Sequence, residues 1–156
     1  MREPCTGCGL VLEGGTAACQ GLFQELIARD FSDVLYFAVH RLAVDAYALQ
    51  HPERYGRSAK SLAAHLTGVC CAMEHDGSPE INAAVQRWLN GRSPISRPEV
   101  PAFRGAMTIA DVLRAPDPAA HADAVRRWAR STWEAWSALH PLARRWIAEA
   151  TRGASA

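Results

Sequence analysis

The sequence has almost no excess of charge of either sign. Its 156 residues include 17 basic and 16 acidic side chains, which gives a formal net charge of +1. Proteins that bind nucleic acids or anionic membranes usually show a basic excess or a basic block. We therefore expect neither a nucleic acid nor a membrane as the partner. A protein or a small molecule is expected instead, and a homodimer is left open.

Long apolar segments are also missing. No run approaches the roughly 18 residues that a membrane-spanning helix requires, and the first residues, Met1–Cys5, lack the hydrophobic region of a secretory signal peptide. These absences predict a cytoplasmic protein. Only one of the basic residues, Lys60, is a lysine, and such a composition is associated with GC-rich bacterial genomes.

Several catalytic signatures are absent as well. There is no glycine-rich phosphate loop, no H-E-x-x-H zinc motif and no G-x-S-x-G nucleophile elbow. The common nucleotide-binding enzymes and hydrolases carry these motifs. Their absence counts against those classes and leaves open whether the protein is an enzyme.

The spacing of apolar residues predicts an all-α fold, a single-domain bundle of five to six helices. The helical part is expected over residues 17–152, between a Cys- and Gly-rich, zinc-knuckle-like arm at 1–16 and a tail at 153–156. Thr16, Ser32, Ser58, Ser78, Thr108 and Asp117 are the expected N-caps. The expected helices cover 17–30, 33–50, 59–74, 79–90, a short turn at 109–114, and 118–139, with a break at His140-Pro141 and a continuation to 152.

Five cysteines are present, an odd number that argues against a disulfide framework. The segment Cys5–Gly9 (C-T-G-C-G) forms a knuckle, a tight turn that presents two thiolates and suits zinc. It is only half of a site because structural zinc takes four ligands. Cys19 is the expected third ligand, in the first turn of its helix, where the positive helix end lowers a thiol pKa. Cys70 and Cys71 are expected to be buried thiols.

The fourth ligand is suggested by helix geometry. The first two helices are joined by a short turn and should pack antiparallel, so the end of the second returns to Cys19. His51 lies at that end, whereas His40 lies about half-way along and is expected opposite Phe23. The alternative is that Cys19 is a buried thiol and His51 a loop residue. The predicted zinc site consists of Cys5, Cys8, Cys19 and His51, with His40 or His65 as the other choices for the fourth ligand.

His40 and His65 both face inward in the helix pattern, and antiparallel packing of their helices would bring them near each other. They are the candidates for a catalytic role beside an open zinc position that activates water or a substrate thiol. The alternative is a pair of core histidines that hydrogen-bond to a backbone carbonyl or a tyrosine. Arg41 and Asp45 are spaced for an ion pair on the surface.

These motifs resemble an uncharacterised bacterial family, a domain of unknown function. The likeness lies in the C-x-G-C-G knuckle, in a cysteine that opens a helix, and in the segment YFAVHRLAVDAYALQHP at 36–52. The segments at 64–66 and 107–113 and the Trp-rich helix that follows are similar too. Thr6 stands where similar sequences tend to have proline. The resemblance implies no activity, and it marks as motif residues Cys5, Cys8, Cys19, His40, Asp45, Gln50 and His51.

Three hypotheses about function follow. The first is a binding or regulatory module whose zinc site is structural. The second is a metal-dependent enzyme that uses His40 or His65. The third is a thiol redox protein that uses Cys5 and Cys8, and it is the weakest because an apolar arm, not a helix, follows the knuckle.

Overall fold

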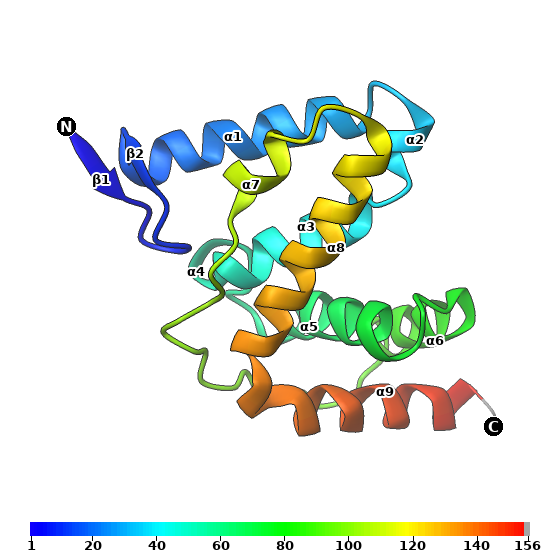
Figure 1. Ribbon diagram of the computed structural model, residues 1–156. Helices are drawn as coiled ribbons and strands as arrows, with labels where there is room; N and C mark the ends of the chain where they lie inside the picture. Colours follow the sequence, from blue (N-terminus) through cyan, green and yellow to red (C-terminus); the bar gives the residue numbers. More distant parts are fainter. Residues whose placement is uncertain (155–156) are drawn as a thin grey trace.

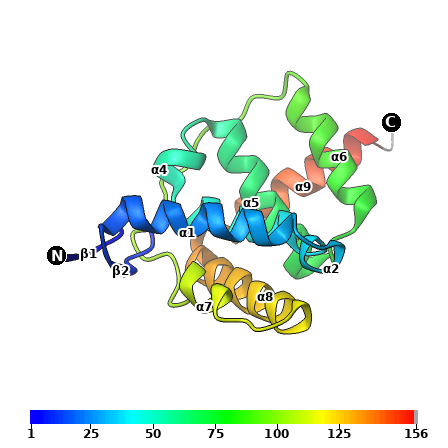
Figure 2. The same cartoon turned by 90° about the horizontal axis from the view of Figure 1, so that it is seen from above.

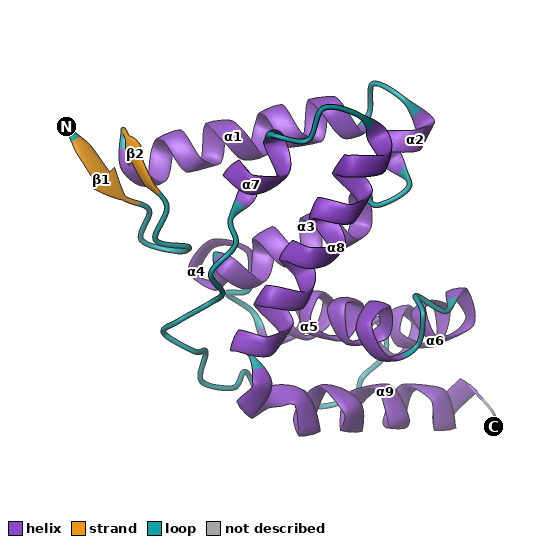
Figure 3. Cartoon of the chain, in the orientation of Figure 1, coloured by secondary structure: helices purple, strands orange, loops and turns teal. Residues whose placement is uncertain are grey.

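Helices dominate the computed structural model, which describes residues 1–154 (Figures 1 and 3). The all-α prediction is confirmed, and the six longer helices agree with the expected number. Within the described range, no helix combines the length and the apolar character needed to cross a bilayer. The helices are α1 (Gly15–Asp30), α2 (Val34–Phe37), α3 (His40–Gln50), α4 (Pro52–Tyr55), α5 (Ala59–Glu74), α6 (Pro79–Asn90), α7 (Ile109–Leu113), α8 (Pro118–Ala135) and α9 (His140–Ala154), with the 3-10 turn η1 (Ser137–Leu139) before α9.

The N-terminal arm is a small β-hairpin. Strand β1 (Arg2–Pro4) pairs antiparallel with β2 (Val11–Glu13), and the knuckle forms the loop between them. The Cys5 amide donates to the Leu10 carbonyl at 2.8 Å, and the Gly9 amide donates to the Cys5 carbonyl at 2.9 Å. Gly9 has a φ of +77°, a conformation that glycine adopts without strain. The pairing of β1 with β2 is a feature of the arm that the sequence did not predict.

The helix predicted over 33–50 is wrong in one respect, because it divides into α2 and α3. Asp33, not Ser32, caps α2, and its Oδ1 accepts from the Leu35 amide at 2.7 Å. The Ser32 hydroxyl donates instead to the Arg29 carbonyl at 2.6 Å. The break lets α3 begin at His40, whose side chain binds the end of α1, so a tertiary contact overrides the helical pattern of the sequence.

Other boundaries also differ from the prediction. The segment 51–56, expected as a loop, contains α4, which has Pro52 in its first turn. Helix α8 ends at Ala135, four residues early, and η1 leads into α9. The expected tail is helical as far as Ala154, and its last two residues lie outside the described range. The predicted starts after Ser58, Ser78, Thr108 and Asp117 are confirmed.

Buried apolar side chains form two clusters. One contains residues of the arm, α1, α3, α7 and α8, and the other contains residues of α5, α6 and α9 with the ends of α3 and α8. Figure 1 shows α1 and α7 at one end of the molecule, α9 at the other, and α8 running between them. In the view from above, α7 and α8 lie on one side of α1, and α4, α5, α6 and α9 on the other (Figure 2). Helices α3 and α8 therefore join the two clusters.

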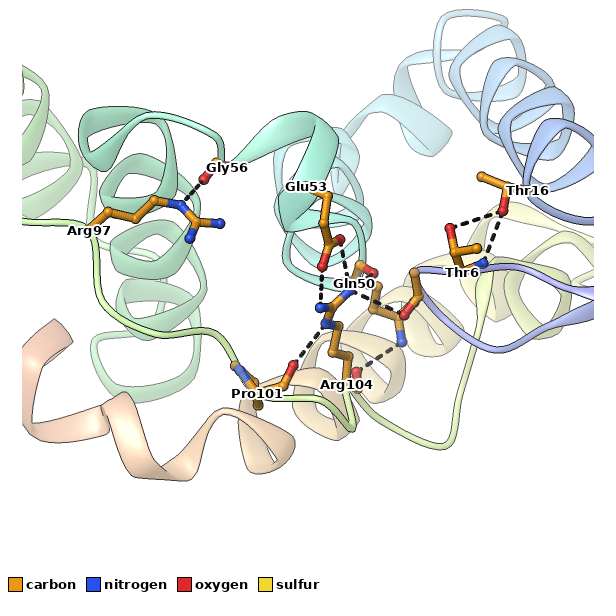
Figure 4. Close-up of polar contacts among 9 residues, drawn as sticks. Thr6, Thr16, Gln50, Glu53, Gly56, Arg97, Pro101 and Arg104 are labelled. Carbon is orange, nitrogen blue, oxygen red and sulfur yellow. Dashed lines mark hydrogen bonds and ion pairs between the residues drawn. The ribbon is translucent and has the colours of Figure 1, made fainter.

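A fully buried glutamine at the end of α3 ties these parts together. Gln50 Nε2 donates to the carbonyl oxygen of Arg104 at 3.1 Å (Figure 4) and to that of Met107 at 2.8 Å. Its Oε1 accepts from Trp128 Nε1 at 2.9 Å. One side chain thus links α3, the loop before α7, and α8. An apolar side chain at position 50 would leave these three polar groups without their partner, and two of the three bonds are buried.

We expect Gln50→Leu to lower the free energy of unfolding by about 3 kcal/mol, because the Trp128 indole and two carbonyls lose their partner. Urea denaturation measures this change. Gln86→Leu is the matched control, since Gln86 is exposed on α6 and, within residues 1–154, its side chain bonds only to Asn90. Equal stability of the two variants would contradict the role assigned to Gln50.

Candidate metal centre

Four side chains converge where the arm meets α1 and the end of α3. Cys5 and Cys8 come from the hairpin loop, Cys19 from α1, and His51 directly follows α3. Their Sγ and Nε2 atoms all lie within 4.8 Å of one another, and Cys8 is the only one of the four that is not buried. These are the four residues that the sequence predicts as ligands.

The distances between these atoms match a tetrahedral site. Cys8 Sγ lies 3.8 Å from Cys19 Sγ, and His51 Nε2 lies 3.4 Å from Cys5 Sγ and 3.5 Å from Cys19 Sγ. Zinc–sulfur bonds of about 2.3 Å and zinc–nitrogen bonds of about 2.0 Å at tetrahedral angles separate two sulfurs by about 3.8 Å and a sulfur from a nitrogen by about 3.5 Å. These three distances, with all four ligand atoms within 4.8 Å of one another, are compatible with a zinc-sized ion at the centre of the cluster.

His51 is oriented for metal binding by its own helix. Its Nδ1 donates to the Tyr47 carbonyl at 2.7 Å, so the neutral imidazole presents the unprotonated Nε2 to the sulfurs. The ring also stacks on Tyr47, with the ring centroids 3.9 Å apart. Metal-ligating histidines are usually held by such a second hydrogen bond.

The cysteines influence one another strongly. The hydrogen bond with Cys19 lowers the pKa of the Cys8 thiol to about 4, and the same contact raises the pKa of Cys19. The Tyr47 hydroxyl lies 3.4 Å from Cys19 Sγ, and burial raises the pKa of this phenol, so it stays a donor. The cluster therefore favours a thiolate at Cys8 and supplies a hydrogen bond to the sulfur of Cys19.

Residues 3–137 match the family of unknown function DUF5946. The chain belongs to this family. The matched range includes all four clustered residues and the helices from α1 to α8. No curated protein and no solved structure matches the chain.

In this DUF5946 member, the knuckle lies directly against His51. A Cβ atom added at Gly7 would lie 2.3 Å from His51 Cδ2 and 2.7 Å from the Gln50 carbonyl oxygen, so only glycine fits. Arg104 Nη1 donates to the Gly7 and Gln50 carbonyls at 3.4 Å each. The guanidinium also forms an ion pair with Glu53 (Figure 4). The buried arginine thus joins the knuckle to the residues around His51.

Two threonines attach the knuckle to α1, which corrects the predicted start of that helix. The Thr6 amide donates to Thr16 Oγ1 at 3.0 Å (Figure 4), a bond that a proline at position 6 lacks the N–H to form. Thr16 lies inside α1, and the N-cap is Gly14, with a φ of +91°. Cys19 consequently lies in the second turn of α1, not the first, where the field of the helix end is weaker.

The structure does not pair His40 with His65. His40 Nδ1 lies 2.8 Å from Asp30 Oδ2, and His65 Nδ1 lies 2.8 Å from Asp45 Oδ1. Each histidine therefore binds its own carboxylate, and its hydrogen-bond partner is neither the backbone carbonyl nor the tyrosine that the core alternative expected. Asp45 is also not a surface residue: its side chain is 9% exposed, although it keeps the expected pair with Arg41.

His40 lies against the end of α1, not opposite Phe23, which stacks on Tyr47 with the centroids 4.0 Å apart. Its partner Asp30 is fully buried and also binds His121, with Nε2 at 3.0 Å from Oδ1. Asp30 and His121 are 91 positions apart, so no local pattern in the sequence links them. Cys70 and Cys71 are buried free thiols, as expected.

We expect Gly7→Ala to lower the free energy of unfolding by about 1–3 kcal/mol, because the methyl group forces the knuckle away from His51. Thermal or urea denaturation measures the loss. Gly21→Ala is the control, because Gly21 is exposed on α1 with no neighbouring atom within 4 Å of its added Cβ. That variant should gain about 0.5–1 kcal/mol, and a harmless Gly7→Ala would argue against the tight contact.

Proposed function

We propose that this protein is a zinc-stabilised helical binding or regulatory module, and that the zinc is structural. The agreement between the Cys–Cys and Cys–His distances and a tetrahedral zinc site carries the proposal. Three thiolates with one imidazole form a donor set typical of structural zinc. Four protein ligands complete the tetrahedron and leave no open position for a substrate.

The other two hypotheses have less support. A catalytic metal would need an open position beside His40 or His65, but these side chains are engaged with Asp30 and Asp45. A redox role would use Cys5 and Cys8. The sulfur within hydrogen-bond distance of Cys8 Sγ, however, is Cys19 Sγ, at 3.8 Å. Both observations favour the structural metal.

The bound metal would link the N-terminal arm to the helices. Strands β1 and β2 have three residues each, and such a short hairpin is only marginally stable by itself. A bound ion would connect the hairpin loop to α1 and to the end of α3, and its binding free energy would add to the free energy of folding.

The proposal includes a reducing compartment, because metal-binding thiolates persist there and the cysteines of the chain are unpaired. We accordingly propose a cytoplasmic bacterial protein. Its partner would be a protein or a small molecule that the helical surface recognises.

Elemental analysis of the purified protein should find one zinc ion per chain. Thiol titration before and after chelation should then show three newly reactive cysteines, because three sulfurs are ligands. No metal and five reactive thiols would overturn the proposal.

We expect Cys5→Ser and Cys19→Ser to lose the zinc and to lower the free energy of unfolding by about 3 kcal/mol or more, because the bound ion stabilises only the folded state. Metal content and urea denaturation measure both effects. Cys70→Ala is the matched control, since Cys70 lies in the core of the other cluster and should leave the zinc in place. Full metal content in Cys5→Ser would refute the ligand assignment.

Tyr47→Phe should keep the zinc but transfer it to a chelator about tenfold faster, because the sulfur of Cys19 loses a hydrogen bond from the phenol. Tyr55→Phe is the control, because the Tyr55 ring contacts the Tyr47 ring in a T-shaped arrangement, with the centroids 5.8 Å apart, and keeps that contact without its hydroxyl. Equal transfer rates in the two variants would show that the phenol does not support the metal.

A further inference from the structure

A pocket of about 510 Å³ lies between α3, α5, α8 and the turn that joins α5 to α6. Its volume is in the range of small-molecule sites. None of the four residues of the candidate metal centre lines it. The pocket is therefore a separate site, and an inference from it goes beyond the proposed structural role of the metal.

Three arginines line this pocket. Arg41 comes from α3, and Arg126 and Arg130 come from α8, where a spacing of four residues puts them on one face. Within residues 1–154, neither Arg126 nor Arg130 forms an ion pair or a hydrogen bond, whereas the intervening Arg127 pairs with Asp123 at 2.9 Å. Two unpaired like charges one turn apart repel each other, and a bound anion between them would offset this electrostatic repulsion.

The third arginine is held in place by a buried carboxylate. Asp45 Oδ2 lies 3.7 Å from Arg41 Nε, and Asp45 Oδ1 lies 2.8 Å from His65 Nδ1. Gly68 on α5 permits this arrangement, since a Cβ there would lie 2.2 Å from Asp45 Oδ2. Asp45 therefore forms an ion pair with Arg41 at the pocket wall, where the Arg41 side chain is 56% exposed.

The remaining polar groups fix where a ligand would sit. Asn82 adds a side-chain amide to the wall, and Asp76, which is exposed, adds a second carboxylate at the turn between α5 and α6. Because Asp45 is already engaged by His65 and Arg41, the α8 side of the pocket carries the uncompensated positive charge. An anionic group is best placed between Arg41 and the two arginines of α8.

We propose that this pocket binds a small organic anion, through a phosphate or carboxylate group held by Arg41, Arg126 and Arg130. Arginine suits this task because its planar guanidinium forms paired hydrogen bonds with both kinds of oxyanion. The rest of the ligand would lie against the apolar part of the wall, which includes Leu42 and Met73.

Isothermal titration of the purified, metal-loaded protein tests the proposal with three probes. Glucose 6-phosphate carries a phosphate, citrate carries carboxylates, and glucose is the neutral control for the sugar. We expect binding of at least one anion at millimolar concentrations and no binding of glucose. The stronger anion identifies the ligand class. Binding of neither anion, or equal binding of glucose and glucose 6-phosphate, would overturn the proposal.

The double variant Arg126→Gln/Arg130→Gln should bind the better anion at least about tenfold more weakly, because the anion loses two charged hydrogen-bond donors. Arg127→Gln is the matched control, because it removes one charge from the same helix outside the pocket. Equal weakening in both variants would indicate non-specific surface attraction and would refute the site. Far-ultraviolet circular dichroism and zinc content verify that both variants remain folded and metal-loaded.

Discussion

The hydrogen bond from His51 Nδ1 to the Tyr47 carbonyl oxygen is the contact on which the site depends. It directs Nε2 towards the three sulfurs and fixes the imidazole against the Tyr47 ring. The neighbouring residue, Gln50, points the other way, to Trp128 and the loop before α7. Two adjacent side chains at the end of α3 thus hold the arm on one side and the helical core on the other.

Four motif residues of α3 and its end contact four different parts of the molecule. His40 binds Asp30 at the end of α1, Asp45 faces the pocket and α5, Gln50 reaches α8, and His51 joins the cysteine cluster. A short helix can do this because successive positions are rotated by about 100° around its axis. Helix α3 therefore organises both the candidate metal centre and the candidate anion pocket.

The two candidate sites differ in how they are built. The metal centre combines a β-hairpin loop, which has little apolar area to bury, with ligands from rigid helices. A bound ion would therefore supply the stabilisation of the hairpin that apolar packing does not. The pocket is formed by helices whose apolar faces are already packed in the two clusters, and it is distinguished by the charged side chains that line it. Asp45 is buried there with His65 and Arg41 as partners, and such a carboxylate is costly unless it is paired.

The sequence by itself determined the all-α class, most helix starts and the Cys5–Cys8 knuckle. These features depend on short-range rules: each cap at Ser58, Ser78 and Asp117 accepts a hydrogen bond from the amide three residues later, and the knuckle is a single turn. Cys19 and His51 could be predicted only with an assumption about helix packing, which left His40 and His65 as other choices for the fourth ligand. Tertiary structure decided the break before α3, the carboxylate partners of His40 and His65, and the pocket. These features depend on contacts between residues far apart in sequence, as with Asp30 and His121, and such pairings leave no periodic signal along the chain.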